Sequence, residues 1–347
     1  MVLEPISTIT WVDSIDETLL RDRVQKMVSL NPWLTGRFVQ DAKDGVIQLG
    51  YNNDTTAPED TSSCAELIHS VEDPALGAYG YQETKSYTKL MTLVEPYLLK
   101  PGLDLKQQQF WKLVIVKPNL LIVSMTHALG DGASYYTLFQ MLITGNIEAV
   151  PIERIFGALQ EEKVKLLGGE QEANLISNWG YLVCFMRGLI TSNLIAPWWP
   201  RAERATARFF LVDPKVIQTI KQDAKKDDVP FVSTNDILAS WFFKETNLGY
   251  ATLVVNLRER LPQLPERNRM GNYQDVIFYR VPKDVATPAL VRKSVQGMKR
   301  TVTHEQPIVA PCPGQIGAIV MGTPSKLQGV SVAAPFEVQE DEPFMMV

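Results

Sequence analysis

Cysteine is scarce in this 347-residue sequence, and the few positions it occupies exclude a disulfide-built fold. The three cysteines, Cys64, Cys184 and Cys312, are odd in number and far apart, so they predict neither a disulfide framework nor a CxxC metal pair. The N-terminus also lacks a basic region followed by an apolar core, so no signal peptide is predicted. We therefore expect a reducing, cytoplasmic compartment.

Basic residues are in the minority. Lysine and arginine number 34 against 39 aspartates and glutamates, and the net charge of -5 argues against nucleic acid, which requires a basic surface on its partner. The histidines at positions 69, 127 and 304 have no spacing suited to a metal site, so no metal is expected. The chain has no internal repeat, and the lack of a G-x-S-x-G motif argues against a serine hydrolase. A hydrophobic content of 45% is typical of a soluble globular protein, and the length allows two domains.

Residues 120–142, LLIVSMTHALGDGASYYTLFQML, are the most informative stretch of the sequence. The apolar run at 120–125 predicts a buried strand, and apolar residues return at helical spacing after residue 134. Between the two, we expect Gly130 and Gly132 to let the chain turn in backbone regions closed to other residues. His127 leaves the strand into this loop and would be held at an edge, where a catalytic base is needed.

The spacing His127-x-x-x-Asp131-Gly132 suggests a division of roles. Near neutral pH, a histidine with an ordinary pKa of about 6.5 can accept a proton from a hydroxyl or an amine. We expect Asp131 to point away from the acceptor and lock the loop through an ion pair, and Gly132 to leave space beside the imidazole. The structural alternative is a buried histidine at the end of a strand, with Asp131 or Ser134 capping the next helix.

Other segments predict further helices and strands. Residues 3–11 and 276–281 have the composition of strands, and 110–116 forms a hairpin with 120–125. A capping box at Ser14-x-x-Glu17 precedes a helix that runs to Leu30, and short helices are expected around 64–71, which includes His69, and around 89–98. Later helices are predicted after Pro214, after a cap at Ser233, Thr234 or Asn235, and over 288–300.

Residues 124–139, SMTHALGDGASYYTLF, together with the paired strands FWKLVIV and LLIVSMT, resemble the CoA-dependent acyltransferase superfamily. This superfamily includes chloramphenicol acetyltransferase, the condensation domains of peptide synthetases, and the BAHD acyltransferases. Many relatives carry a second histidine at the position of Thr126, and its absence here favours the BAHD branch. Residues 251–273, ATLVVNLRERLPQLPERNRMGNY, are similar to a second family segment with paired arginines and a Gly-Asn end.

The resemblance implies an α/β fold built from two chloramphenicol-acetyltransferase-like subdomains, with mixed sheets flanked by helices and a tunnel between them. The expected division is an N-terminal subdomain at 1–155, a helical crossover at 156–205 and a C-terminal subdomain at 206–347. The last of these is shortened and lacks the Asp-Phe-Gly-Trp-Gly motif of BAHD enzymes. No oligomeric state is predicted.

The resemblance also implies a reaction. His127 would deprotonate a small alcohol or amine acceptor, which attacks an acyl-CoA thioester directly; acyl-CoA is a co-substrate, and no cofactor is expected. Thr126, Gly271 and Asn272 would lie at the substrate tunnel, although Gly271-Asn272 also fits an ordinary turn.

Two arginines are candidate partners for Asp131. Arg258 and Arg260 follow a predicted strand, and a partly buried carboxylate requires a cation or several donors. The alternative is that both arginines are solvated at the end of the strand.

Two further functions stay open at this point. One is a condensation-type enzyme that takes its acyl group from a carrier protein. The other is a non-catalytic descendant that binds a lipid or a partner protein, which is motivated by the shortened C-terminal part and by the apolar segment 178–199. Arg187 places a charge in the middle of that segment, which argues against a transmembrane helix. The segment predicts instead a buried helix, or an interfacial helix in peripheral contact with a membrane.

Overall fold

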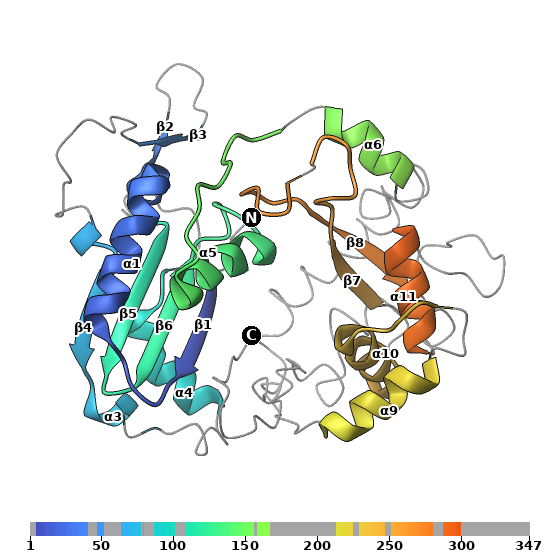
Figure 1. The fold of residues 1–347 in the computed structure, drawn as a ribbon, viewed down its shortest axis with the longest axis horizontal. Helices are drawn as coiled ribbons and strands as arrows, with labels where there is room; N and C mark the ends of the chain where they lie inside the picture. The colour runs from blue at the N-terminus through green and yellow to red at the C-terminus, as the bar shows by residue number, and fades with distance from the viewer. Residues whose placement is uncertain are drawn as a thin grey trace, which may run out of the picture.

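The computed structural model has a mixed α/β fold with sheets flanked by helices, as predicted (Figure 1). The structure describes residues 5–40, 47–51, 64–77, 79, 87–100, 109–155, 158–166, 213–224, 229–246, 251–264, 266–279 and 287–299. The segment 178–199 and the region beyond residue 299 lie outside the described residues. The division of the chain near residues 155 and 205 stays a prediction.

A four-stranded sheet organises the N-terminal part, and the strand that precedes His127 is one of its two central strands. Its order is β1-β6-β5-β4, with β6 antiparallel to both neighbours and Met125 of β6 opposite Ile6 of β1 and Trp111 of β5. The predicted hairpin of β5 and β6 is therefore confirmed. The strands are β1 (Ile6–Trp11), β4 (Ile68–Glu72), β5 (Trp111–Lys117) and β6 (Leu120–Met125).

The predicted helix around 64–71 is wrong beyond residue 65. Residues 68–72 form β4, which pairs in parallel with β5, and His69 lies on this strand, half-buried. The backbone N–H of Leu113 donates to the carbonyl of Leu67 at 2.9 Å and continues the pairing. Strand formation here depends on a partner that lies some 40 residues further along the chain, and local periodicity does not report such a partner.

Helices cover both faces of this sheet, and β6 is buried along its whole length. Because alternate side chains of a strand point to opposite faces, Leu121 and Val123 join the core under α1 and α5, whereas Leu120 and Ile122 join the core under α3 and α4. Burial of each such side chain stabilises the fold by about 1.5–3 kcal/mol relative to exposure. The helices are α1 (Glu17–Leu30), α3 (Pro74–Gly77), α4 (Tyr87–Val94) and α5 (Gly132–Thr144).

The N-cap residue of helix α1 differs from the predicted one. The side chain of Asp16 accepts from the N–H of Leu19 at 2.9 Å, so Asp16 is the N-cap and Ser14 lies outside the helix. Glu17 is the first helical residue and cannot serve as the third residue of a capping box.

The second part of the chain packs around a two-stranded antiparallel sheet of β7 (Ala251–Asn256) and β8 (Gln274–Tyr279), with Val255 opposite Asp275. Its core joins buried residues of both strands to Phe243 of α10 and Val291 of α11. Among the three predicted cap residues for α10, Ser233 is the cap: its Oγ accepts from the N–H of Asp236 at 3.2 Å. The helices are α6 (Ala158–Leu166), α9 (Pro214–Ala224), α10 (Thr234–Thr246) and α11 (Pro288–Gly297).

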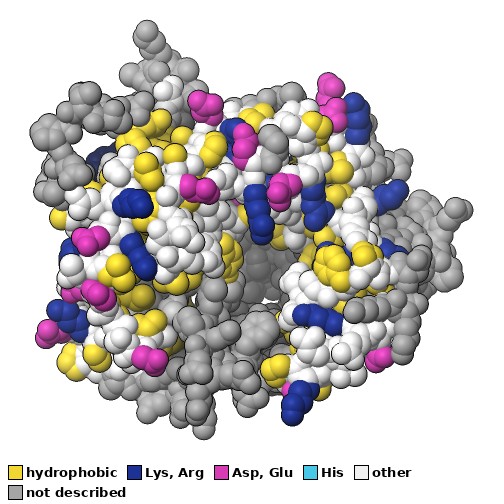
Figure 2. Space-filling model, in the orientation of Figure 1, with side chains coloured by type: hydrophobic (Ala, Val, Ile, Leu, Met, Phe, Trp, Pro, Cys, Tyr) yellow, Lys and Arg dark blue, Asp and Glu magenta, His cyan; other side chains and the backbone are white. Residues whose placement is uncertain are grey.

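Shorter elements complete the described structure: η1 (Pro32–Thr35), β2 (Arg37–Gln40), β3 (Ile47–Gly50) and η3 (Glu95–Tyr97). The four-stranded sheet and the β7–β8 sheet lie at opposite sides of the molecule in Figure 1, and the face shown in Figure 2 is hollowed between them. Within the described parts of the chain, no helix has both the length and the hydropathy needed to cross a bilayer.

Candidate active site

His127 stands two residues beyond the end of β6, in a loop that ends where α5 begins. The N–H of Thr126 donates to the carbonyl of Phe110 at 2.7 Å and extends the pairing with the residue before β5. The N–H of Leu129 then donates to the carbonyl of Thr126 at 3.0 Å and closes a turn around His127. Thr126 is buried, whereas His127 is half-buried. The central strand thus fixes where the histidine leaves the sheet.

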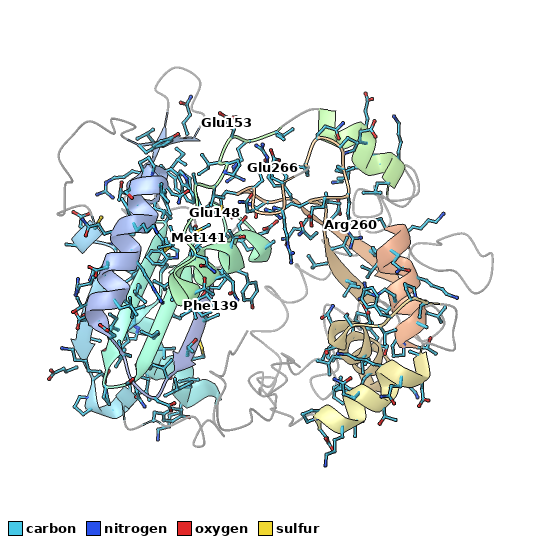
Figure 3. All side chains as sticks on the ribbon, viewed as in Figure 1. Phe139, Met141, Glu148, Glu153, Arg260 and Glu266 are labelled. Carbon is cyan, nitrogen blue, oxygen red and sulfur yellow. The ribbon has the colours of Figure 1, made fainter. Side chains whose placement is uncertain are left out.

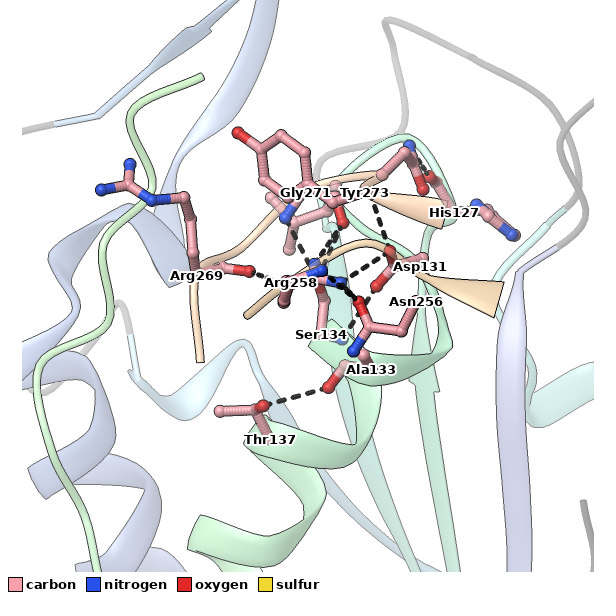
Figure 4. A network of polar contacts seen from close by, with 12 residues as sticks. His127, Asp131, Ala133, Ser134, Thr137, Asn256, Arg258, Arg269, Gly271 and Tyr273 are labelled. Atoms are coloured by element: carbon pink, nitrogen blue, oxygen red, sulfur yellow. Dashed lines mark hydrogen bonds and ion pairs between the residues drawn. The ribbon is translucent and has the colours of Figure 1, made fainter. Parts of the chain in front are cut away.

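The imidazole of His127 takes no part in the hydrogen bonds that hold the loop. Figure 4 shows it on the outer side of the polar network, pointing away from Asp131. Its Nδ1 is buried, and no group in the described parts of the chain bonds to that atom. The main chain of His127 is held instead, because the side-chain amide of Asn272 donates to its carbonyl at 2.9 Å. Among the described contacts, the loop is therefore held through the main chain of His127 and not through its ring.

Asp131 caps α5 and joins the two parts of the molecule. Its Oδ1 accepts from the N–H of Ser134 at 3.0 Å, so Asp131 rather than Ser134 is the cap. Its Oδ2 accepts from Nη1 of Arg258 at 2.9 Å and from the N–H of Tyr273 at 2.8 Å. Asp131 is 1% exposed and Arg258 is 2% exposed, so this ion pair is fully withdrawn from water. A buried pair of this kind requires good geometry and further hydrogen bonds.

Arg258 meets that requirement, because each of the five N–H donors of its guanidinium group has an acceptor. Nη1 donates to Asp131 and to Oδ1 of Asn256 at 3.0 Å. Nη2 donates to Oγ of Ser134 at 3.0 Å and to the carbonyl of Gly271 at 2.8 Å, and Nε donates to the carbonyl of Arg269 at 2.7 Å. The guanidinium carbon also lies 5.1 Å from the centre of the Tyr273 ring, a cation–π contact (Figure 4).

Arg260 does not reach the site, so its prediction as a structural residue there is wrong. Arg260 is exposed and donates to the carbonyl of Val295 on α11, and Figure 3 shows it on that side of the molecule. The residue between the two arginines, Glu259, has a φ of 61°, and the N–H of Arg260 donates back to the carbonyl of Leu257. The chain reverses between the two arginines, so Arg258 points to Asp131 and Arg260 points to α11.

The glycines of the loop act differently from the prediction. Neither Gly130 nor Gly132 has a positive φ; near the site, that conformation occurs at Gly271, with a φ of 142°. A Cβ on Gly130 would lie 2.5 Å from the side chain of Ser134, so close approach is what requires glycine there. A Cβ on Gly132 would meet nothing within 4 Å, which leaves the expected open space at this position.

The sequence interpretation missed four residues of this network: Ser134 as an acceptor for Arg258, and Asn256, Tyr273 and Arg154. Arg154 lies in the segment that links α5 to α6, and its Nη2 donates to the carbonyls of Ala128 and Leu129 at 3.2 and 2.6 Å. Burial lowers the pKa of Arg154, and the charge of Asp131 partly offsets that effect. Among the described residues, no three side chains of His, Cys, Asp or Glu gather in a way that could hold a metal ion.

No protein-family model matches the chain, and no curated protein sequence matches it. Solved structures do match it. The first condensation domain of the calcium-dependent antibiotic synthetase, in complex with substrate analogue 2a, is 12% identical with a TM-score of 0.43, and the match covers 85% of this chain and 69% of that chain. A second structure of the first condensation domain of the CDA synthetase is 13% identical with a TM-score of 0.44, covering 98% and 78%.

TRI101 of F. sporotrichioides, complexed with coenzyme A and T-2, is 12% identical with a TM-score of 0.40, and the match covers 95% of this chain and 73% of that chain.

Proposed function

We propose that the protein is an acyltransferase in which His127 is the general base. The acceptor is a hydroxyl or amine compound, and the donor is an acyl-CoA thioester. The observation that supports this most directly is the half-buried imidazole at the end of β6, which is free of the described hydrogen-bond network while its loop is held on both sides. A base that must keep one position and still exchange protons requires this combination.

The proposed reaction has two stages and no covalent enzyme intermediate. The O–H or N–H bond of the acceptor breaks as its proton passes to the imidazole of His127, and the acceptor forms a bond to the thioester carbonyl carbon. The C–S bond then breaks, and the departing thiolate takes the proton from the imidazolium. Asp131 keeps its bonds to Arg258 and Tyr273 throughout, so its role is to hold the loop.

The direct test measures release of free thiol from a panel of acyl-CoAs in the presence of mixed alcohols and amines. We expect acceptor-dependent release that His127→Ala reduces by about 10²- to 10⁴-fold, the usual contribution of general-base catalysis. His69→Gln is the matched control, since His69 lies on the edge strand β4, and its activity should stay that of the wild type. Thermal melting checks that both variants fold. Unchanged turnover in His127→Ala would exclude the proposed base.

The same assay with donors bound to a carrier protein shows whether the enzyme takes its acyl group from a carrier protein or from free acyl-CoA. Faster transfer from the carrier-bound thioester than from free acyl-CoA would show a condensation-type enzyme. Absence of turnover with every donor, in a folded protein that binds lipid, would favour the non-catalytic alternative.

A further inference from the structure

The loop that carries His127 is held from outside through successive carbonyl groups. The carbonyl of His127 accepts from Asn272, and the carbonyls of Ala128 and Leu129 accept from Arg154. These donors come from two segments far away in the sequence, one between α5 and α6 and one before β8. The middle of the loop therefore depends on side chains that are outside the His127–Asp131 motif.

Arg154 is itself firmly placed. The N–H of Met270 donates to the carbonyl of Pro151 at 2.8 Å, and the N–H of Ile155 donates to the hydroxyl oxygen of Tyr273 at 3.1 Å. These bonds fix the segment on both sides of Arg154 against the segment that supplies Gly271 and Tyr273. The Nη1 of Arg154 also lies 2.8 Å from the point where a Cβ on Gly271 would stand, so only glycine leaves room for the guanidinium.

This half-buried arginine binds the main chain and not a carboxylate. No ion pair joins Arg154 to a carboxylate in the described parts of the chain, and its hydrogen-bonded acceptors are the two loop carbonyls. A guanidinium group is planar and presents donors in a fixed fork, so it can hold neighbouring carbonyls in a defined geometry that a lysine ammonium cannot reproduce.

We propose that Arg154 is a positioning residue for His127: it fixes the carbonyls of Ala128 and Leu129, the two residues that follow the histidine, and thereby sets the direction of the imidazole. The catalytic consequence rests on the proposed function, whereas the structural consequence does not. Displacement of a catalytic group by about 1 Å can reduce turnover on the order of 10²-fold, so loss of this contact should lower turnover.

The chain offers a matched control. Arg23 of α1 is also half-buried, and its Nη1 donates to the successive carbonyls of Leu142 and Ile143 at 2.9 and 2.7 Å. These carbonyls belong to the C-terminal end of α5, whereas Arg154 acts just before the N-terminal end. Arg23→Met and Arg154→Met therefore remove the same kind of contact from opposite ends of one helix.

The first measurement is the long-range ¹H–¹⁵N spectrum of the histidine side chains. The chain has only three histidines, so His69→Gln, His127→Gln and His304→Gln assign every signal. We expect Arg154→Met to shift or split the signals of His127 and to leave those of His69 and His304 in place. Arg23→Met should leave all three unchanged. An unaltered His127 signal in folded Arg154→Met would overturn the proposal.

The second measurement is turnover in the thiol-release assay. Arg154→Met should lower kcat by about 10- to 100-fold and leave the KM for the thioester nearly unchanged, because the loss is one of orientation and not of binding. Arg154→Lys should fall between Arg154→Met and the wild type, and it decides the question if Arg154→Met does not fold. Arg23→Met should retain wild-type kcat; an equal loss in both variants would mean a general effect on α5 and would overturn the positioning role.

The two measurements separate the two proposals. If the wild type transfers no acyl group but the His127 signals move in Arg154→Met, the positioning contact stands and the proposed function fails. If the wild type is active and neither kcat nor the signals respond to Arg154→Met, the proposed function stands and the positioning contact fails.

Discussion

Among the described residues, two buried aspartates each pair with an arginine, and the two pairs lie in different settings. Asp131 and Asp236 are each 1% exposed, and each lies at the start of a helix, α5 or α10. Asp131 pairs with an arginine 127 residues later, across the two parts of the molecule, and Asp236 pairs with Arg292, 56 residues later, on the adjacent helix α11. Only the first pair holds the loop of His127.

The difference teaches that a buried ion pair by itself identifies architecture and not function. The carboxylate of Asp236 accepts from the N–H of Ser233 at 2.7 Å and from Nε of Arg292 at 2.8 Å, and the guanidinium group of Arg292 lies over the ring of Phe231. These contacts join α11 to the start of α10 and to the segment just before it. The network at Asp131 differs because it also holds the loop of His127, which lies four residues before the aspartate.

Alanine at each aspartate tests this comparison most strongly. Asp131→Ala leaves the buried Arg258 without its carboxylate, and Asp236→Ala leaves the partly buried Arg292 without its carboxylate. Each change should lower the free energy of unfolding, by about 3–5 kcal/mol for the fully buried pair and by less for the other. Urea unfolding of both variants measures that loss. Under conditions in which both remain folded, Asp131→Ala should also lose kcat, and Asp236→Ala should keep it. Equal loss of kcat in the two variants would remove the distinction between the pairs.

A glycine in each region sharpens the comparison without removing a charge. Gly271 has a φ of 142°, and an added Cβ would lie 2.7 Å from the Tyr273 ring, so Gly271→Ala should lower the free energy of unfolding by about 1–3 kcal/mol. Gly297 ends α11, and a Cβ there would meet only the side chain of Lys299, at 3.8 Å. Gly297→Ala should stabilise by up to about 1 kcal/mol, because alanine narrows the unfolded ensemble. Thermal and urea unfolding give both values, and a stable, fully active Gly271→Ala protein would contradict the role given to this segment.

The partly exposed pair of Glu17 and Arg21 supplies the smallest expected effect. Glu17 bonds to Arg21 at 2.7 Å on the surface of α1 and accepts from Ser70, and the Ser70 hydrogen bond and the Arg21 contact lower the pKa of Glu17 below its usual value. Because the folded-state pKa is lowered, the stabilisation is present above the usual glutamate pKa and is lost as the pH falls through the lowered value. Glu17→Gln should therefore cost less than about 1 kcal/mol at neutral pH. The difference from wild type should disappear in urea unfolding at acidic pH; a difference that persists there would show that charge is not its origin.

The sequence predicted the centre of the molecule well and its connections less well. The run 120–125, the loop and helix α5 follow from local patterns, since a continuous apolar run and helical spacing are properties of neighbouring residues. Strand β4 was missed because Ile68 is its one buried residue, so the apolar pattern is weak, and the segment becomes a strand only through its pairing with β5. The cap at Asp16 was missed by two residues because serine and aspartate are equally good caps.

The site shows the same limit. The sequence identified His127 and Asp131 and restricted the partner to two arginines, but the turn at Glu259 that separates them depends on the fold of the β7–β8 connection. Arg154 had no detectable signal, because its acceptors are backbone carbonyls and any residue type supplies those. A side chain that bonds the main chain of a distant segment cannot be predicted from the residue types near it in the sequence.

The span of the Asp131–Arg258 contact has a consequence for synthesis of the chain. Ribosomes add about 5–20 residues per second, so Arg258 follows Asp131 by roughly 6–25 seconds, and Tyr273 follows later still. All residues of β1, β5, β6 and α5 precede position 145, so these elements are synthesised before Arg258. Until Arg258 follows, the carboxylate of Asp131 lacks the cation with which it forms the buried ion pair. The nascent sheet can form with a histidine loop that is not yet held. The loop therefore becomes ordered late, and His127 has no fixed position until the second part of the chain has been synthesised.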